Sequence, residues 1–228
     1  HKLIIPFLIP FLLIMAIGPK LKWIRSNLEN KIYLISLLVI SILLSYLIVK
    51  NFEYNFLINS ILISSALYLF FMNLRDFFIQ KYQNISQNIS HFGFSLLILS
   101  ILFNNLFSTE IITNLKVGET FESSKTKIVF ENVSQRTGKN YESIVGNFNI
   151  QNSKGKIENF LPELRIYNQP NIVTSEADIK TTLISDKFIV INLVQNQDYF
   201  NIRYQIKPYM VWIWISVLLI CCGGLISL

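Results

Sequence analysis

Long apolar segments separated by short polar ones fill the first half of the chain, and this pattern predicts membrane-spanning helices. The apolar segments cover residues 3–17, 32–49, 56–72 and roughly 89–107, and a fifth covers 210–228. Most of them approach the roughly 20 residues that a helix needs to cross a bilayer. The first is the shortest, and two prolines interrupt it. We therefore predict a membrane α-helical bundle of about five spans, four of them within residues 1–107 and the last within 210–228.

The polar segment 108–209 shows a different period. The stretch YFNIRYQIK (199–207) alternates apolar and polar side chains, as a half-buried antiparallel strand does. The stretches TKIVFENV, GNFNIQN and KFIVINLV are also strand-like, and RTGKN and NSKGK have the composition of turns. We predict a small all-β domain inserted between the fourth and fifth spans.

Positive charge in the loops predicts the orientation of the spans. The loops PKLKWIRSNLENK (19–31) and NLRDFFIQKYQNISQN (73–88) carry an excess of Lys and Arg, whereas KNFEYN (50–55) is balanced. Because positive loops stay in the cytoplasm, the first two loops lie inside. Residues 108–209 are then extracytoplasmic.

Composition and charge narrow the class of protein further. The chain of 228 residues is 52% hydrophobic and only 15% charged, whereas soluble domains are about 25% charged. The net charge of +6 comes from scattered residues with no basic helix, which argues against a nucleic-acid partner. Adjacent cysteines such as Cys221 and Cys222 are poorly placed for a disulfide or a zinc site. The sequence begins with HKLIIPF and not with a methionine, so we expect it to be a piece of a longer protein.

His91 is the strongest candidate for a functional side chain. It lies near the start of the fourth apolar segment, where an ionisable group is costly and indicates function. A neutral imidazole is also a common ligand of haem iron. On a helix, Phe94 and Ser95 share its face and are candidate contacts of a bound ring. The alternative is a histidine at the water interface, hydrogen-bonded to lipid headgroups or to Asn88.

Two other stretches are candidate partner-binding surfaces. Trp212 and Trp214 start the last span as part of an aromatic belt, and one of them could face a partner or cofactor groove. In FLPELRIYNQPNIVTSEADI (160–179), Arg165 and Tyr167 stand among several acidic residues. Residues 108–209 contain no histidine or cysteine that could activate a serine, so no nucleophile–base pair is visible there. Hydrolysis by paired carboxylates is a poor explanation of this stretch.

Four stretches, in order, resemble the CcmF family, the large haem lyase subunit of system I cytochrome c maturation. They are PFLIPFLLIMAIGPKLKW, ISHFGFSLLILS, LPELRIYNQP and YQIKPYMVWIWISVLLICCGGLISL, and the resemblance covers essentially the whole chain. It implies a role in attaching haem covalently to apocytochrome c at the periplasmic side of the inner (cytoplasmic) membrane. It also implies a haem b within the membrane, with His91 as one axial ligand, because SHFG here stands where the family has A-H-x-G.

The same resemblance implies that essential parts lie elsewhere. The family's tryptophan-rich segment, its two exported histidines and the second axial ligand of the haem b are absent from this chain. The implied partners are therefore the upstream half of the haem lyase, the haem chaperone and apocytochrome c, and the chain alone is not expected to be catalytic. Two alternatives remain open: a non-catalytic membrane-anchored module that binds a partner, and a transporter fragment. The second is disfavoured because only the first span is broken.

Overall fold

The structure is a computed structural model that describes residues 5–18, 31–52, 56–79, 85–123, 126–153, 155–194 and 198–227. His1 and nearly all of the basic loop at 19–31 lie outside these ranges. The chain divides into two compact units. One is helical and comprises residues 1–106 and 212–228, and the other comprises residues 107–211.

The helical unit has helices that indicate a membrane protein, but it does not confirm a bundle of five spans. Its helices are α1 (Ile5–Ile17), α2 (Lys31–Val49), α3 (Phe56–Ile79), α4 (Ile85–Phe107) and α5 (Met210–Ile226). Within the described residues, three segments are long and apolar enough to cross a membrane: Ile32–Val49, Phe56–Phe78 and Ile85–Phe107. The segments Pro6–Ile17 and Met210–Ile226 are also apolar but shorter.

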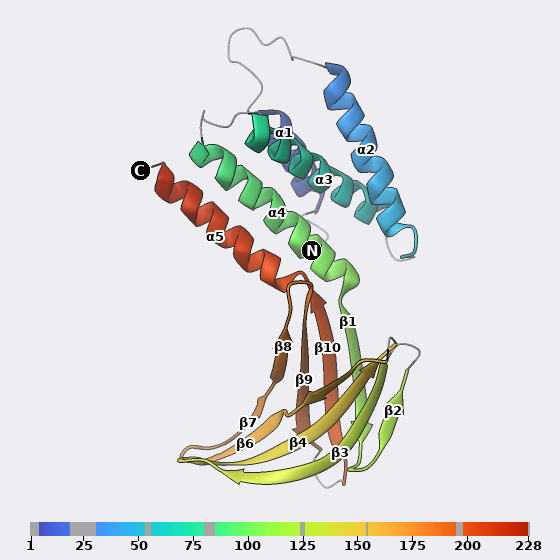
Figure 1. The fold of residues 1–228 in the computed structure, drawn as a ribbon, viewed down its shortest axis with the longest axis vertical. Helices are drawn as coiled ribbons and strands as arrows, with labels where there is room; N and C mark the ends of the chain where they lie inside the picture. The colour runs from blue at the N-terminus through green and yellow to red at the C-terminus, as the bar shows by residue number, and fades with distance from the viewer. Residues whose placement is uncertain are drawn as a thin grey trace. The chain divides into compact units, whose positions relative to one another are not determined.

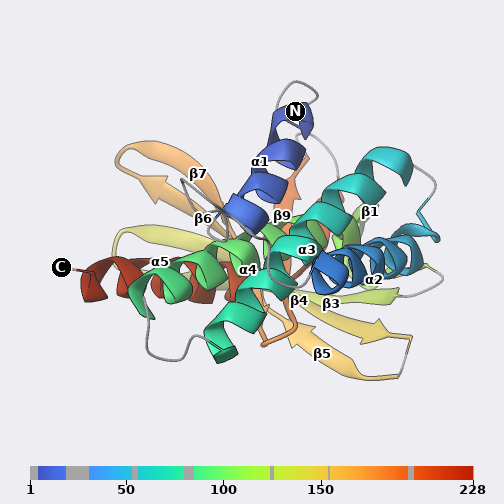
Figure 2. The ribbon, with the colours of Figure 1, turned by 90° about the horizontal axis from the view of Figure 1, so that it is seen from above.

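Helix α3 is the centre of the helical unit. Figures 1 and 2 show α2, α3, α4 and α5 in that order across the unit. The side chains of α3 that have almost no exposed surface pack against α1, α2 and α4; they include Ala66, Leu69 and Met72. Membrane helices gain little from hydrophobic burial against one another, so close side-chain packing of this kind holds them together.

Small residues let α4 and α5 approach closely. A Cβ atom added to Gly93 would lie 3.0 Å from the carbonyl oxygen of Ser216. A Cβ added to Gly223 would lie 2.8 Å from the backbone of both Ser86 and Ser90. The hydroxyl of Ser86 donates to the carbonyl oxygen of Gly223 at 2.7 Å. These contacts place α5 antiparallel to α4, with backbone near backbone.

The second unit is a β-sandwich, which confirms the all-β prediction. One sheet has the order β1-β10-β9-β8, and the other has the order β2-β3-β4-β6-β7, with β5 paired to β4. All the pairings are antiparallel. The strands are β1 (Thr109–Leu115), β2 (Thr120–Glu122), β3 (Thr126–Thr137), β4 (Tyr141–Asn152), β5 (Ile157–Phe160), β6 (Glu163–Asn168), β7 (Asn171–Glu176), β8 (Asp178–Thr181), β9 (Ser185–Leu193) and β10 (Phe200–Pro208).

Alternate side chains of facing strands form the core of the sandwich. Ile202 and Tyr204 of β10 are buried, as their alternation predicts. Burial raises the pKa of Tyr204 to about 12. The rings of Phe130 and Phe148 stack at 4.3 Å in the other sheet. On the opposite face of β10, Gln205 is also buried, and its amide donates to Glu110 of β1. The side of β10 that was predicted to face water is therefore only partly exposed to solvent.

Candidate functional site

The backbone of His91 is tied to helix α3. His91 lies in the second turn of α4 and is half-buried. Its carbonyl oxygen accepts a hydrogen bond of 3.1 Å from Nδ2 of Asn73, a side chain that is itself buried. An amide in an apolar surrounding is costly without a partner, so this bond stabilises the α3–α4 contact where the histidine lies.

The imidazole of His91 stands beside a small polar cluster. Asp76 of α3 acts on the ring electrostatically. Nη1 of Arg75 lies 3.8 Å from Oδ1 of Asp76, and the guanidinium of Arg75 lies 4.7 Å from the centre of the Tyr33 ring of α2. In the described part of the chain, neither ring nitrogen of His91 has a protein hydrogen-bond partner. The side chain therefore keeps the lone pair that haem ligation requires, and the residues present fit such a ligand.

The aromatic residues that follow His91 in α4 pack against α3 and α1. Phe92 contacts Phe70 and Phe77 of α3, with ring centres 5.6 and 5.8 Å apart. Phe94 meets Phe11 of α1 edge to face at 6.3 Å. Ser95 is fully buried, and its hydroxyl donates to the carbonyl of Phe92 at 2.8 Å. Phe94 thus lies at the α1–α4 contact, and Ser95 bonds within its own helix. Their role as haem contacts stays a prediction.

Sequence reasoning missed the contributions of α3 to this site. Asn73 and Asp76 are three residues apart at the polar end of an apolar segment, so they share one face of the helix. That spacing was a usable signal. The register that sets Asn73 against the carbonyl of His91 was not readable, because it depends on how two helices pack.

Arg165 and Tyr167 of β6 belong to a charged and aromatic cluster on one sheet. Pairing of β6 with β4 sets Tyr167 against Tyr141, and pairing with β7 sets Glu163 against Glu176. We call the cluster of Tyr141, Glu163, Arg165, Tyr167 and Glu176 the Arg165 surface.

Contacts within the Arg165 surface hold the guanidinium in place. Nε of Arg165 donates to Glu163 at 3.1 Å, and its Nη1 lies 4.0 Å from Glu176. The guanidinium also lies 4.8 Å from the centre of the Tyr141 ring. Hydrogen bonds with Glu163 and Tyr167 raise the pKa of Arg165 above its usual value, so it stays cationic.

Glu176 and Asp178, two neighbouring acidic residues of the stretch 160–179, do not act as a pair. Glu176 ends β7 and belongs to the Arg165 surface. Asp178 starts β8 in the other sheet, and its carboxylate accepts a hydrogen bond of 2.7 Å from the backbone N–H of Leu161. One carboxylate is engaged by an arginine and the other by the backbone.

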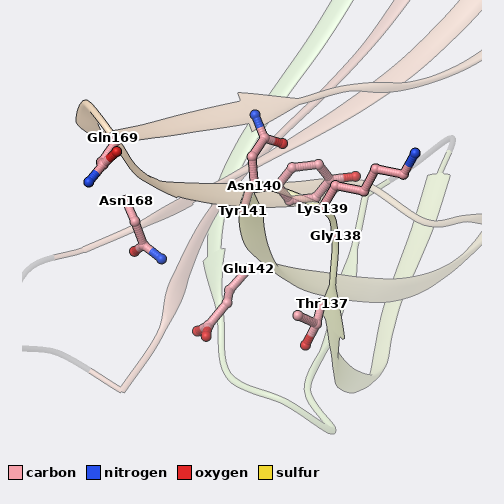
Figure 3. A pocket seen from close by; sticks show the side chains of 8 residues that line it. All are labelled: Thr137, Gly138, Lys139, Asn140, Tyr141, Glu142, Asn168 and Gln169. Atoms are coloured by element: carbon pink, nitrogen blue, oxygen red, sulfur yellow. The ribbon is translucent and has the colours of Figure 1, made fainter.

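A polar hollow of about 410 Å³ adjoins the Arg165 surface at Tyr141. It lies between the β3–β4 turn and the β6–β7 turn, and Figure 3 shows its lining side chains. The sequence indicated the first turn but not that the second lies beside it, which follows from the β4–β6 pairing. The lining residues are Thr137, Gly138, Lys139, Asn140, Tyr141, Glu142, Asn168 and Gln169.

Trp212 and Trp214 lie near the start of α5, as expected. Trp214 is 66% exposed and Trp212 is 37% exposed. The carbonyl of Trp212 accepts a hydrogen bond from Ser216, within the same helix. Both rings therefore keep surface available to lipid or to a partner.

Comparisons with known proteins agree with this fold. Residues 106–208 match the family model described as the CcmF C-terminal beta-sandwich. The chain is 25% identical over 235 residues to the cytochrome c-type biogenesis protein CcmF of Escherichia coli strain K12, covering 97% of this chain and 36% of the relative. It is 26% identical over 237 residues to the CcmF of Haemophilus influenzae, covering 96% of this chain and 36% of that protein.

A solved structure of a protein titled cytochrome c heme lyase CcmF has the same fold. It superposes with a TM-score of 0.72 at 20% identity, over 98% of this chain and 39% of that one. The chain spans about a third of the length of the Escherichia coli and Haemophilus influenzae relatives.

Proposed function

We propose that this chain, which corresponds to the C-terminal portion of CcmF-family proteins, is the part of a membrane haem lyase that carries one axial ligand of an intramembrane haem b. Its function would be the maturation of cytochrome c by covalent attachment of haem to apocytochrome c. The upstream half of the lyase, supplied by the same or another polypeptide, would complete the site, including the second axial ligand.

One observation carries the proposal: a half-buried imidazole on a candidate span whose ring nitrogens have no protein partner among the described residues. Asn73 would fix the α4 backbone at His91, and Phe92, packed on α3, would keep the helix from rotating. When bound, the haem would supply a redox-active iron that can pass an electron to the incoming haem. The residues of this chain would orient the imidazole and exclude water from it.

We also propose that α1 and α5 cross the membrane together with the three longer helices. Helix α5 runs along α4 through Gly93, Ser86 and Gly223, so it shares the environment of a candidate span. Its 17 residues reach about 26 Å at 1.5 Å per residue. With the basic loops in the cytoplasm, residues 108–209 lie on the periplasmic side of the inner membrane.

Four partly or largely exposed polar and aromatic side chains are our candidates for docking. Arg165 and Tyr167, with Trp212 and Trp214, would contact the haem chaperone or apocytochrome c. Tyr, Trp and Arg dominate the binding energy of protein interfaces, and Arg165 is already held in one orientation by Glu163 and Tyr141. A preoriented side chain loses less entropy on binding.

The proposal is tested by co-expressing the chain with the upstream portion of a CcmF protein in cells that lack their own. Haem that stays on cytochrome c through a denaturing gel measures covalent attachment. We expect His91→Ala to reduce it to background and His1→Ala, the same chemical change elsewhere, to leave it intact. We expect Arg165→Gln to reduce it by about two- to tenfold, as the loss of about 0.4–1.4 kcal/mol of docking energy would.

Full cytochrome c maturation with His91→Ala would contradict the proposed ligand. An unmatured cytochrome c with the wild-type pair, in cells where the complete relative works, would favour the alternative of a non-catalytic partner-binding module.

A further inference from the structure

The turn between β8 and β9 has an unusual composition. Leu183 and Ile184 form its tip, and they are 67% and 72% exposed. Turn tips are normally Gly, Pro, Asn, Asp or Ser, because those residues favour turn geometry or bond their own backbone. Two large and mostly exposed apolar side chains are therefore unusual at such a tip.

The hydrogen bonds that close this turn come from its flanks. The N–H of Thr182 donates to the carbonyl of Ser185 at 3.1 Å, and its hydroxyl donates to the same carbonyl at 2.8 Å. The N–H of Ser185 donates to the hydroxyl of Thr182 at 3.0 Å. These hydrogen bonds therefore involve Thr182 and Ser185, while the apolar side chains between them are largely exposed.

The tip lies at the point where the β-sandwich continues into α5. The N–H of Tyr209 donates to the carbonyl of Ile184 at 2.8 Å, and Ser185 pairs with Pro208. Met210 is the first residue of α5. Tyr209 itself has a left-handed φ of 62°, so the chain bends sharply there, directly against the turn. These contacts all lie within residues 107–211, and Figure 1 shows the end of β10 where they occur.

The same end of the sheet also carries the connection from α4. Thr109, two residues after the end of α4, pairs with Ile206 of β10. Both chain crossings into the helical unit and the β8–β9 tip therefore share one end of the four-stranded sheet. The opposite end offers a matched comparison: Leu193, at the far end of β9, is 47% exposed and pairs with Phe200.

We propose that Leu183 and Ile184 insert into the lipid bilayer at the boundary between headgroups and acyl chains, beside the start of α5. The occupant of this surface is lipid, because the tip is hydrogen-bonded to the residue that precedes a proposed span, and apolar side chains at that level leave water for hydrocarbon. The turn then forms a third attachment of the β-sandwich to the membrane, after α4 and α5. The inference rests on the proposed assignment of α5 as a span.

Fluorescence quenching in nanodiscs of phosphatidylethanolamine and phosphatidylglycerol tests the inference on the full chain. Cys221 and Cys222 are replaced by Ser, and a single cysteine at Leu183, Ile184 or Leu193 is labelled with an environment-sensitive fluorophore. Two quenchers are compared: lipid with a nitroxide near the headgroup end of its acyl chain, and iodide in the water. All three substituted side chains are exposed, so the core of the sandwich is unchanged.

We expect labels at 183 and 184 to lose most of their fluorescence to the nitroxide lipid and little to iodide, and the label at 193 to show the reverse. Iodide quenching at 184 equal to that at 193 would overturn the inference. Protection of 184 from both quenchers would overturn it too, because protein rather than lipid would then cover the tip.

A separate label on the native cysteines of α5, which are exposed, reports on the span itself. If that label is quenched by the lipid and the label at 184 is not, only the inference fails. If that label escapes the lipid quencher, α5 is not a span, and the premise fails with the inference.

Discussion

Glu158 shows how a single partly buried charge stabilises the β-sandwich. Its carboxylate accepts a hydrogen bond from Lys187 at 2.7 Å and lies 3.0 Å from Lys156. Burial by itself would raise the pKa of Glu158, but the hydrogen bonds from Lys187 and Lys156 outweigh burial and hold the pKa below its usual value of 4.5. The side chains of Glu158 and Lys187 are only 14% and 17% exposed, so solvent screens this pair weakly.

This lowered pKa gives a stability prediction with a definite sign. A carboxylate with a lower pKa in the folded state stabilises the fold above its unfolded pKa, and the effect disappears as the pH falls through the folded pKa. We expect Glu158→Gln to lower the free energy of unfolding of the sandwich by about 1–2 kcal/mol at neutral pH. The difference from wild type should shrink as the pH falls from about 5 to below 4.

Hydrogen exchange of the β-strand amides in the full chain measures this free energy. Glu142→Gln, at an exposed position on β4, is the matched control and should change the free energy by less than about 0.5 kcal/mol. A difference for Glu158→Gln that stays the same down to low pH would show that packing, not charge, explains it.

Single residues could be predicted from the sequence only where one residue carries the signal. His91 stood out because histidine is rare in this chain and lies within an apolar segment. Asn73 did not, because its role is visible only once α3 and α4 are packed and its amide meets the carbonyl of His91. The sequence indicated that Arg165 stands in a group of charged residues. It did not indicate Tyr141, because this aromatic member of the cluster comes from another strand.

At the scale of elements, the contact between α4 and α5 depends on one of two neighbouring glycines. A Cβ at Gly223 would meet the backbone of Ser86 and Ser90, whereas a Cβ at Gly224 would meet nothing within 4 Å. We expect Gly223→Ala to destabilise the helical unit by about 1–3 kcal/mol through overpacking. Gly224→Ala should be neutral or stabilising by up to about 1 kcal/mol, because alanine has the higher helix propensity.

Equilibrium unfolding of the full chain in mixed micelles, followed by circular dichroism, compares the two variants. Equal stabilities would contradict the close α4–α5 approach. A pair of glycines in an apolar segment is typical of close packing between helices. The sequence does not show which of the two glycines makes the contact, since that depends on the rotation of α5.

Elements with a clear period were well predicted, and their departures have physical causes. The alternation in β10 gave a strand with Ile202 and Tyr204 buried. Gln205 is buried although it lies on the face predicted to be exposed to water, and its amide donates a hydrogen bond to Glu110 of the neighbouring strand. The pairing of β4 with β6, which brings the hollow and the Arg165 surface together, has no signature in the sequence of either strand.

At the scale of the whole molecule, the division into a helical unit and a β-sandwich follows from one change in the hydrophobic pattern along the chain. Apolar segments near the length of a span gave the helical unit, and alternation gave the sandwich. The number of spans did not follow as directly, because α1 and α5 are shorter than the usual crossing length. Their assignment as spans depends on packing against the longer helices, which the sequence does not display.

The central claim is that the imidazole of His91 ligates an intramembrane haem b. It is tested most directly by the Soret absorption of the chain purified together with its upstream portion, comparing wild type, His1→Ala and His91→Gly with and without added imidazole. We predict a b-type spectrum for wild type and His1→Ala, its loss in His91→Gly, and its recovery when free imidazole fills the vacated space. A complete b-type spectrum in His91→Gly without imidazole would contradict the account.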